Sequence, residues 1–122
     1  MKMRMGLIAL IAAFLCAGIA NANTLRVVVL QTADAAAYVK ALEEGKAILK
    51  TKGSSGVIRA WQATYAGENT GMVVVSVEYP NLEALAKDYA LMRNDADLRA
   101  WLAGLAKVRK IVSDSIYEEL KP

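Results

Sequence analysis

Five residues in the middle of the chain have side chains that could bind a small molecule: Arg59, Trp61, Tyr65, Ser76 and Glu78. The rings of Trp61 and Tyr65 could form a flat wall for an aromatic or lipid-like ligand, and Arg59 could hold a carboxylate or an enolate oxygen. In a cofactor-free oxygenase or isomerase, the same arginine would stabilise an oxyanion on the substrate. These residue types therefore indicate ligand binding, and catalysis is a further alternative.

The same residues also suit a contact surface between proteins. If the hairpin pairs Trp61 with Ser76, Arg59 falls opposite Glu78, and the two charges neutralise one another beside the indole. Interfaces are enriched in Trp, Tyr and Arg for packing alone. Packing favours this second interpretation, in which Arg59 and Glu78 form a salt bridge beside Trp61 in an interface. The sequence leaves both ligand binding and the interface open.

Few other side chains could support catalysis or bind a metal. The sequence has no histidine, and its single cysteine, Cys16, lies within the first 22 residues. Asp95 and Asp97 could bind a hard cation weakly, but their position beside Asn94 is more typical of a helix cap. The glycines of Gly53-Ser54-Ser55-Gly56 lack the spacing of a phosphate-binding loop. We therefore expect no cofactor and no metal.

The first 22 residues have the pattern of a signal peptide. Lys2 and Arg4 form a cationic start, residues 6–20 are apolar, and Ala20-Asn21-Ala22 offers the small residues that a signal peptidase needs. This apolar run is shorter than the roughly 20 residues that cross a bilayer as a helix. We expect cleavage after Ala22, a periplasmic or secreted protein, and no stable membrane insertion afterwards; an uncleaved N-terminal anchor is the alternative.

Cleavage after Ala22 would leave residues 23–122 as a single domain of nearly neutral charge. Loss of Lys2 and Arg4 lowers the Lys and Arg count from 15 to 13 against 12 Asp and Glu, so the net charge falls from +3 to +1. Binding to nucleic acid needs a concentrated basic surface, which this composition does not supply. We therefore expect no nucleic-acid partner.

The hydrophobic period of residues 23–122 alternates between that of strands and that of helices. The predicted strands are residues 25–30, 57–65, 72–79 and 110–117. The predicted helices run from Asp34 to about Lys52 and from Asn81 to about Val108, with an interruption or bend at Asn94-Asp95. The order βαββαβ favours an α+β fold of the ferredoxin-like type, in which a four-stranded antiparallel sheet carries its helices on one face.

The other face of this sheet would be bare in a monomer. Alternation along the two hairpin strands places on it Val57, Arg59, Trp61, Ala63, Tyr65, Met72, Val74, Ser76 and Glu78. Such a face is too apolar to leave in water and too polar for an ordinary core. We therefore expect a homodimer that pairs two such faces, with a small apolar or aromatic ligand in a cavity between the sheets.

The chain resembles the dimeric α/β-barrel superfamily, nearest to its NIPSNAP-like and antibiotic-biosynthesis-monooxygenase-like members. The resemblance rests on the element order, on Trp61 in a hairpin strand, on Glu78-Tyr79-Pro80-Asn81 between a strand and a helix, and on Asp95-Ala96-Asp97 before Trp101. It implies the ferredoxin-like fold paired as a dimeric α/β barrel. The superfamily includes cofactor-independent oxygenases, haem-degrading enzymes, isomerases and members without assigned activity, so the fold does not settle the function.

Three function classes follow from these observations. The first is a non-enzymatic or weakly binding periplasmic barrel dimer, because no set of residues demands catalysis. The second is a cofactor-independent monooxygenase or isomerase acting on an aromatic or polyketide-like substrate. The third is a subunit whose bare sheet face meets another protein.

Export should remove residues 1–22 and leave Asn23 as the first residue of the mature chain, because the cationic, apolar and small-residue segments occur in the order that signal peptidase recognises. The intact mass of protein recovered from the cell envelope measures this directly. A mass that still includes Met1 to Ala22 would contradict the expected cleavage.

Overall fold

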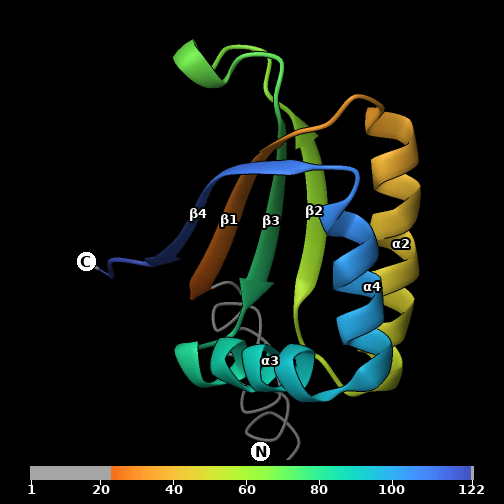
Figure 1. The fold of residues 1–122 in the computed structure, drawn as a ribbon. Helices are drawn as coiled ribbons and strands as arrows, with labels where there is room; N and C mark the ends of the chain where they lie inside the picture. Colours follow the sequence, from red (N-terminus) through yellow and green to blue (C-terminus); the bar gives the residue numbers. More distant parts are fainter. Residues whose placement is uncertain (1–22, 122) are drawn as a thin grey trace, which may run out of the picture.

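Four antiparallel strands form one sheet in the computed structural model, which describes residues 23–121 (Figure 1). The elements are β1 (Thr24–Gln31), α2 (Ala35–Thr51), β2 (Val57–Gln62), β3 (Val73–Tyr79), α3 (Leu82–Asn94), α4 (Ala96–Ala106) and β4 (Lys110–Glu118), and a short 3-10 turn η1 (Gly67–Asn69) lies in the β2–β3 loop. The strand order is β2-β3-β1-β4. The predicted ferredoxin-like α+β fold is therefore confirmed. The proposed signal peptide lies outside the described residues.

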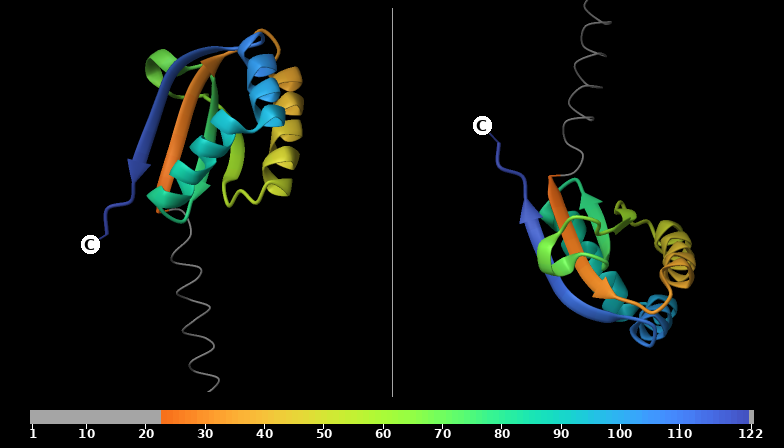
Figure 2. Two further views of the ribbon diagram at one scale, coloured as in Figure 1. Left: turned by 60° about the horizontal axis from the view of Figure 1, so that its bottom comes forward. Right: turned by 90° about the horizontal axis from the view of Figure 1, so that it is seen from above.

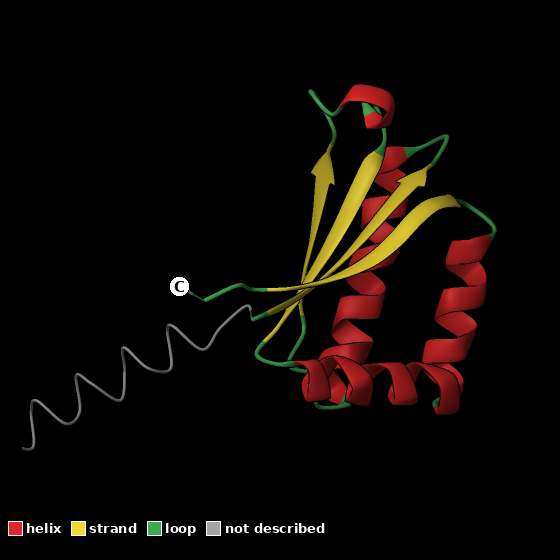
Figure 3. Ribbon diagram, turned by 90° about the vertical axis from the view of Figure 1, so that its left-hand side faces the viewer, coloured by secondary structure: helices red, strands yellow, loops and turns green. Residues whose placement is uncertain are grey.

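The helices all lie on one side of the sheet. Figure 2 shows α2 and α4 side by side over this face, and Figure 3 shows α3 lying across one end of them. No helix of residues 23–121 is both long and apolar enough to cross a membrane. The opposite side of the sheet, which we call the open face, carries no helix of residues 23–121.

Side chains that cap the helices fix where each one begins. Asp34 accepts a hydrogen bond from the Ala37 N–H at 3.0 Å, and Asn81 accepts one from the Ala84 N–H at 2.8 Å. Asp95 accepts from the Leu98 N–H at 3.1 Å, which ends α3 and starts α4. That hydrogen bond, with the Lys52 ammonium, lowers the pKa of Asp95. The interruption predicted at Asn94-Asp95 is thus a break between two helices.

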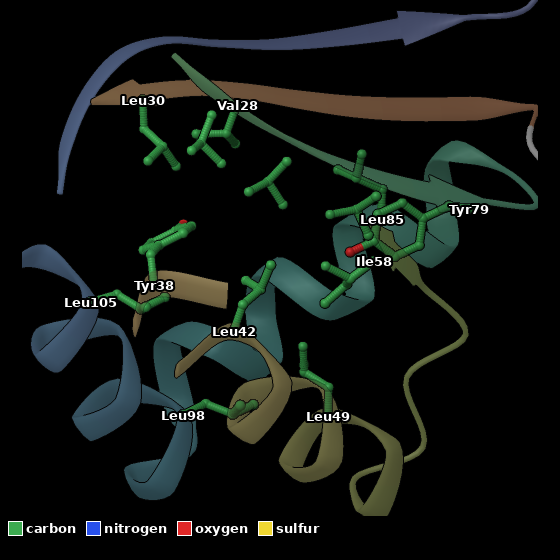
Figure 4. Close-up of a cluster of buried hydrophobic side chains, with 13 residues drawn as sticks. Val28, Leu30, Tyr38, Leu42, Leu49, Ile58, Tyr79, Leu85, Leu98 and Leu105 are labelled. Atoms are coloured by element: carbon green, nitrogen blue, oxygen red, sulfur yellow. The ribbon is translucent and has the colours of Figure 1, made fainter. Parts of the chain in front are cut away.

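The core lies between the sheet and the helices (Figure 4). Alternate strand residues point toward the helices because side chains alternate along a strand. Val28 and Leu30 of β1 pair directly with Val75 and Val73 of β3, so these four share the helix-facing side. Leucines of all three helices meet them, and Leu30 and Leu98 have no exposed surface. The sheet face predicted to meet the helices is the one that does.

A close contact between Trp101 and Gly45 joins α4 to α2. A Cβ atom at position 45 would lie 2.0 Å from the Trp101 ring, so only glycine leaves room for the indole. The indole N–H also donates to the Ala41 carbonyl at 2.8 Å. Trp101 is therefore a packing anchor that sets the spacing of the two helices.

Gly45→Ala should destabilise the domain by about 1–3 kcal/mol, because the new methyl group overlaps the indole and forces the helices apart. Gly104→Ala is a matched control within α4. Nothing lies within 4 Å of a Cβ there, so it should stabilise the domain by about 0.5–1 kcal/mol through helix propensity. Urea unfolding measures both, and equal effects of the two substitutions would contradict the packing described.

Candidate functional site

The open face brings four of the five predicted site residues together. The Trp61 indole N–H donates to Ser76 Oγ at 2.8 Å, and the Arg59 guanidinium lies 3.3 Å from Glu78 Oε1. Both contacts join β2 to β3 across the hairpin. The two predicted side-chain pairs are therefore present.

The predicted strand register is wrong by two residues. Arg59 lies directly opposite Ser76, and Trp61 lies opposite Val74, so the two contacts run diagonally between the strands. The cause is the hairpin loop, in which the Ala63 N–H bonds the Met72 carbonyl and Gly71 takes a positive φ of 90°. A shift of two residues keeps each side chain of β2 and β3 on its face, so within these two strands the open face has the expected residues.

Tyr65 lies apart from the other four residues. Strand β2 ends at Gln62, and Tyr65 is 100% exposed in the loop that follows. The structure therefore does not bring its ring against Trp61 to form a flat wall. The polar groups of the other four residues bond one another in two pairs. The site on the open face is therefore a half-exposed Trp61 beside the neutralised pair of Arg59 and Glu78.

A second location combines apolar walls with charged groups. It is a cavity of about 60 Å³ between the sheet and the helices, which we call the helix–sheet cavity. Its apolar lining includes Val28 and Val75 from the sheet and Leu42 and Trp101 from the helices. Its polar lining consists of Arg26, Tyr38 and Arg109.

Arg26 is held by a partner on β4. Its Nε and Nη2 donate to the two oxygens of Asp114 at 3.0 and 2.7 Å, which is the bidentate geometry of a strong ion pair. This hydrogen bonding raises the pKa of Arg26 and lowers the pKa of Asp114. The guanidinium also lies 4.8 Å from the centre of the Tyr89 ring. Arg26 is thus neutralised within the chain.

Arg109 has a different environment. Its Nη1 donates to the hydroxyl of Tyr38 at 3.0 Å, and within residues 23–121 its buried Nε has no hydrogen-bond partner. The sequence pattern does not indicate this site, because Arg109 lies beside Lys107 and Lys110 in a cationic segment that is typical of a solvated helix end. The available signal was Arg26, a charged residue at a helix-facing position of an apolar strand.

Within residues 23–121, no group of three or more His, Cys, Asp or Glu side chains could hold a metal ion.

Comparison with known proteins shows that this chain is similar in fold to solved structures. No family model matches the sequence, and no curated protein matches it significantly. A solved structure of a NIPSNAP family protein from Agrobacterium tumefaciens str. C58 is 14% identical, covers 81% of this chain and 92% of its own, and has a TM-score of 0.58. The chain shares the fold of that NIPSNAP family protein.

Two further solved structures are similar. A conserved protein from Methanosarcina mazei Go1 is 14% identical over 81% of this chain and 95% of its own, with a TM-score of 0.54. A protein of unknown function from Bacteroides thetaiotaomicron VPI-5482, described as a possible oxidoreductase, is 13% identical over 80% of this chain and 99% of its own. Its TM-score is 0.49. The Agrobacterium and Methanosarcina structures support the NIPSNAP-like resemblance at the level of fold.

The Arg26–Asp114 pair should make stability depend on pH. Because the folded state lowers the pKa of Asp114, the pair stabilises the protein above the carboxyl's unfolded pKa, and this contribution is lost as pH falls through the folded pKa. Asp114→Asn should lower the free energy of unfolding by about 1 kcal/mol at pH 7, since the pair is only partly buried.

Urea unfolding at several pH values between 7 and about 2 measures this difference. The gap between wild type and Asp114→Asn should shrink as the solution becomes more acidic. Glu44→Gln, at an exposed position of α2, controls for the loss of one negative charge. A gap that stays constant with pH would contradict the assigned pair.

Proposed function

We propose that the protein is an exported homodimer that binds a small ligand in the helix–sheet cavity and pairs its two chains through the open face. The observation that carries the binding proposal is the cavity itself. It joins apolar walls to a few polar groups, which is the usual composition of a small-molecule site. A well-packed core leaves few spaces larger than a water molecule, so a space with two arginines on its wall suggests a ligand.

The open face supports the dimer proposal through its exposed apolar side chains. Trp61 is 52% exposed, and Tyr117 on β4 is 57% exposed. The strand register places both residues on the same face of the sheet. Tyr117 pairs with Leu25, Leu25 pairs with Glu78, and Glu78 pairs with Val57. Val57 and Trp61 are four residues apart on β2, so their side chains point to the same face. A second copy that packs face to face would cover Trp61 and Tyr117, and it would bury polar groups that are already hydrogen-bonded.

The export proposal rests on the N-terminal pattern described above. Lys2 and Arg4 precede an apolar run and the small residues Ala20 and Ala22. The remaining chain, residues 23–122, contains no cysteine and so needs neither oxidation nor reduction to fold.

Binding is the activity that this site supports. General acid–base catalysis needs a group that can take up or release a proton near neutral pH, commonly a histidine or a carboxylate. The residues that line the helix–sheet cavity within the described chain include no Asp, Glu or His. We therefore do not extend the proposal to catalysis.

A mass spectrum of small molecules released from protein purified from its own host tests the binding proposal. An organic molecule should be recovered in stoichiometric amount from wild type. Leu42→Trp should reduce its recovery, because the larger ring would fill the cavity, and Leu82→Trp at an exposed position of α3 is the matched control. Recovery unaffected by Leu42→Trp would contradict binding in this cavity.

Trp61→Glu should convert the dimer to a monomer or to insoluble material, because it places a charge in the proposed interface. Tyr65→Glu is the matched control, since Tyr65 is an aromatic residue exposed in the neighbouring loop. Light scattering at micromolar concentration should report a dimer for wild type and for the control. A monomeric wild type would remove the basis of the dimer proposal.

A further inference from the structure

The helix–sheet cavity has a charge imbalance that indicates the chemistry of its ligand. Of its two arginines, Arg26 is neutralised by both oxygens of Asp114. Arg109 makes no ion pair with any residue of the described chain, and its only side-chain hydrogen bond there is to the neutral hydroxyl of Tyr38. Asp114 also interacts electrostatically with Arg109, so the wall has two guanidinium charges and one nearby carboxylate, and one positive charge remains in excess.

Two groups at the same wall can donate hydrogen bonds to a bound molecule. The Nε of Arg109 is buried and unpartnered within residues 23–121. The Tyr38 hydroxyl accepts from Arg109 Nη1, so its own proton is available to a bound acceptor. Tyr38 is 1% exposed, so water does not readily replace that acceptor. An unpaired buried donor destabilises a fold unless something else satisfies it.

Resting on the proposed function, we infer that the ligand of the helix–sheet cavity is a short-chain organic monocarboxylate, bound by the Arg109 guanidinium and the Tyr38 hydroxyl. A carboxylate supplies the missing negative charge and two acceptor oxygens for the two donors. The apolar lining favours a short hydrocarbon tail and disfavours a strongly hydrated dianion such as phosphate.

The size of the cavity limits the ligand. The cavity measures about 60 Å³. An engineered cavity of about 150 Å³ holds benzene, so the present space suits a smaller molecule of the size of acetate or propionate. Met92 and Ile111 also line the cavity and are partly exposed at the protein surface.

Titration of the protein with sodium propionate, monitored by the NMR resonance of the Trp101 indole N–H, tests this inference. Ionic strength is kept constant with sodium chloride, and propionamide is the neutral probe of nearly equal shape. Propionate should shift the Trp101 resonance with a dissociation constant on the order of millimolar, and propionamide should bind at least about tenfold more weakly. The Trp101 indole lies in the cavity wall and therefore reports occupancy there.

Arg109→Met should weaken propionate binding at least about tenfold and leave propionamide binding unchanged. It should also leave the free energy of unfolding equal to or higher than that of the wild type, because it removes a buried unpaired donor. Arg99→Met, at an exposed position of α4, is the matched control and should change neither property. Tyr38→Phe retains the ring and should weaken propionate binding alone.

The outcomes separate the two proposals. If propionamide binds as tightly as propionate, the inferred charge selectivity is overturned and the cavity remains a binding site. If propionate binds but Arg109→Met binds it equally well, the assignment of Arg109 is overturned. If neither probe shifts the Trp101 resonance and no molecule is released from native protein, binding in the cavity itself is overturned.

Discussion

Burial of one face of the sheet beneath the helices is the constraint on which the rest of this structure depends. Apolar residues occupy every second position of β3 and the positions of Val28 and Leu30 on β1, and the apolar stripes of α2, α3 and α4 cover them. Because side chains alternate along each strand, burial of one face determines which residues lie on the open face. The helix–sheet cavity and the open face are therefore two consequences of one pattern.

The spacing of the helices follows from a few specific contacts. Trp101 fits against Gly45, and Asp95 ends one helix and begins the next. Lys52, at the end of α2, lies 3.0 Å from Asp95 and so joins the two helix ends. Trp101 also lines the helix–sheet cavity, so the contact that sets the helix spacing also shapes the candidate site.

The sequence predicted much of this fold because local signals agreed with one another. The caps at Asp34, Asn81 and Asp95 were identifiable from residue type and position, and the switch of hydrophobic period located each strand and helix. The register of the hairpin was mispredicted because it depends on how the loop between Gln62 and Val73 closes. That geometry involves a left-handed glycine, which residue pattern alone does not locate.

The candidate site was harder to predict than the fold. One hairpin carries Arg59, Trp61, Ser76 and Glu78. The alternation of side chains along its two strands therefore predicted that they share a face, and in the structure they contact one another in pairs. Arg26, Tyr38 and Arg109 come from three separate elements and meet only when the helices pack on the sheet. A site assembled by tertiary packing leaves little local signal in the sequence.

The burial of Trp61 against a second copy is the central claim, and ¹⁹F NMR tests it most directly. The chain has two tryptophans, so labelling with 5-fluorotryptophan gives one resonance for Trp61 and one for Trp101. The difference in chemical shift between H₂O and D₂O reports the exposure of each ring. At the micromolar to millimolar concentrations at which the chain is proposed to be a dimer, this difference should be small for Trp61, because the second copy covers its ring. A Trp61 ring that remains solvent-exposed at these concentrations would contradict the claim.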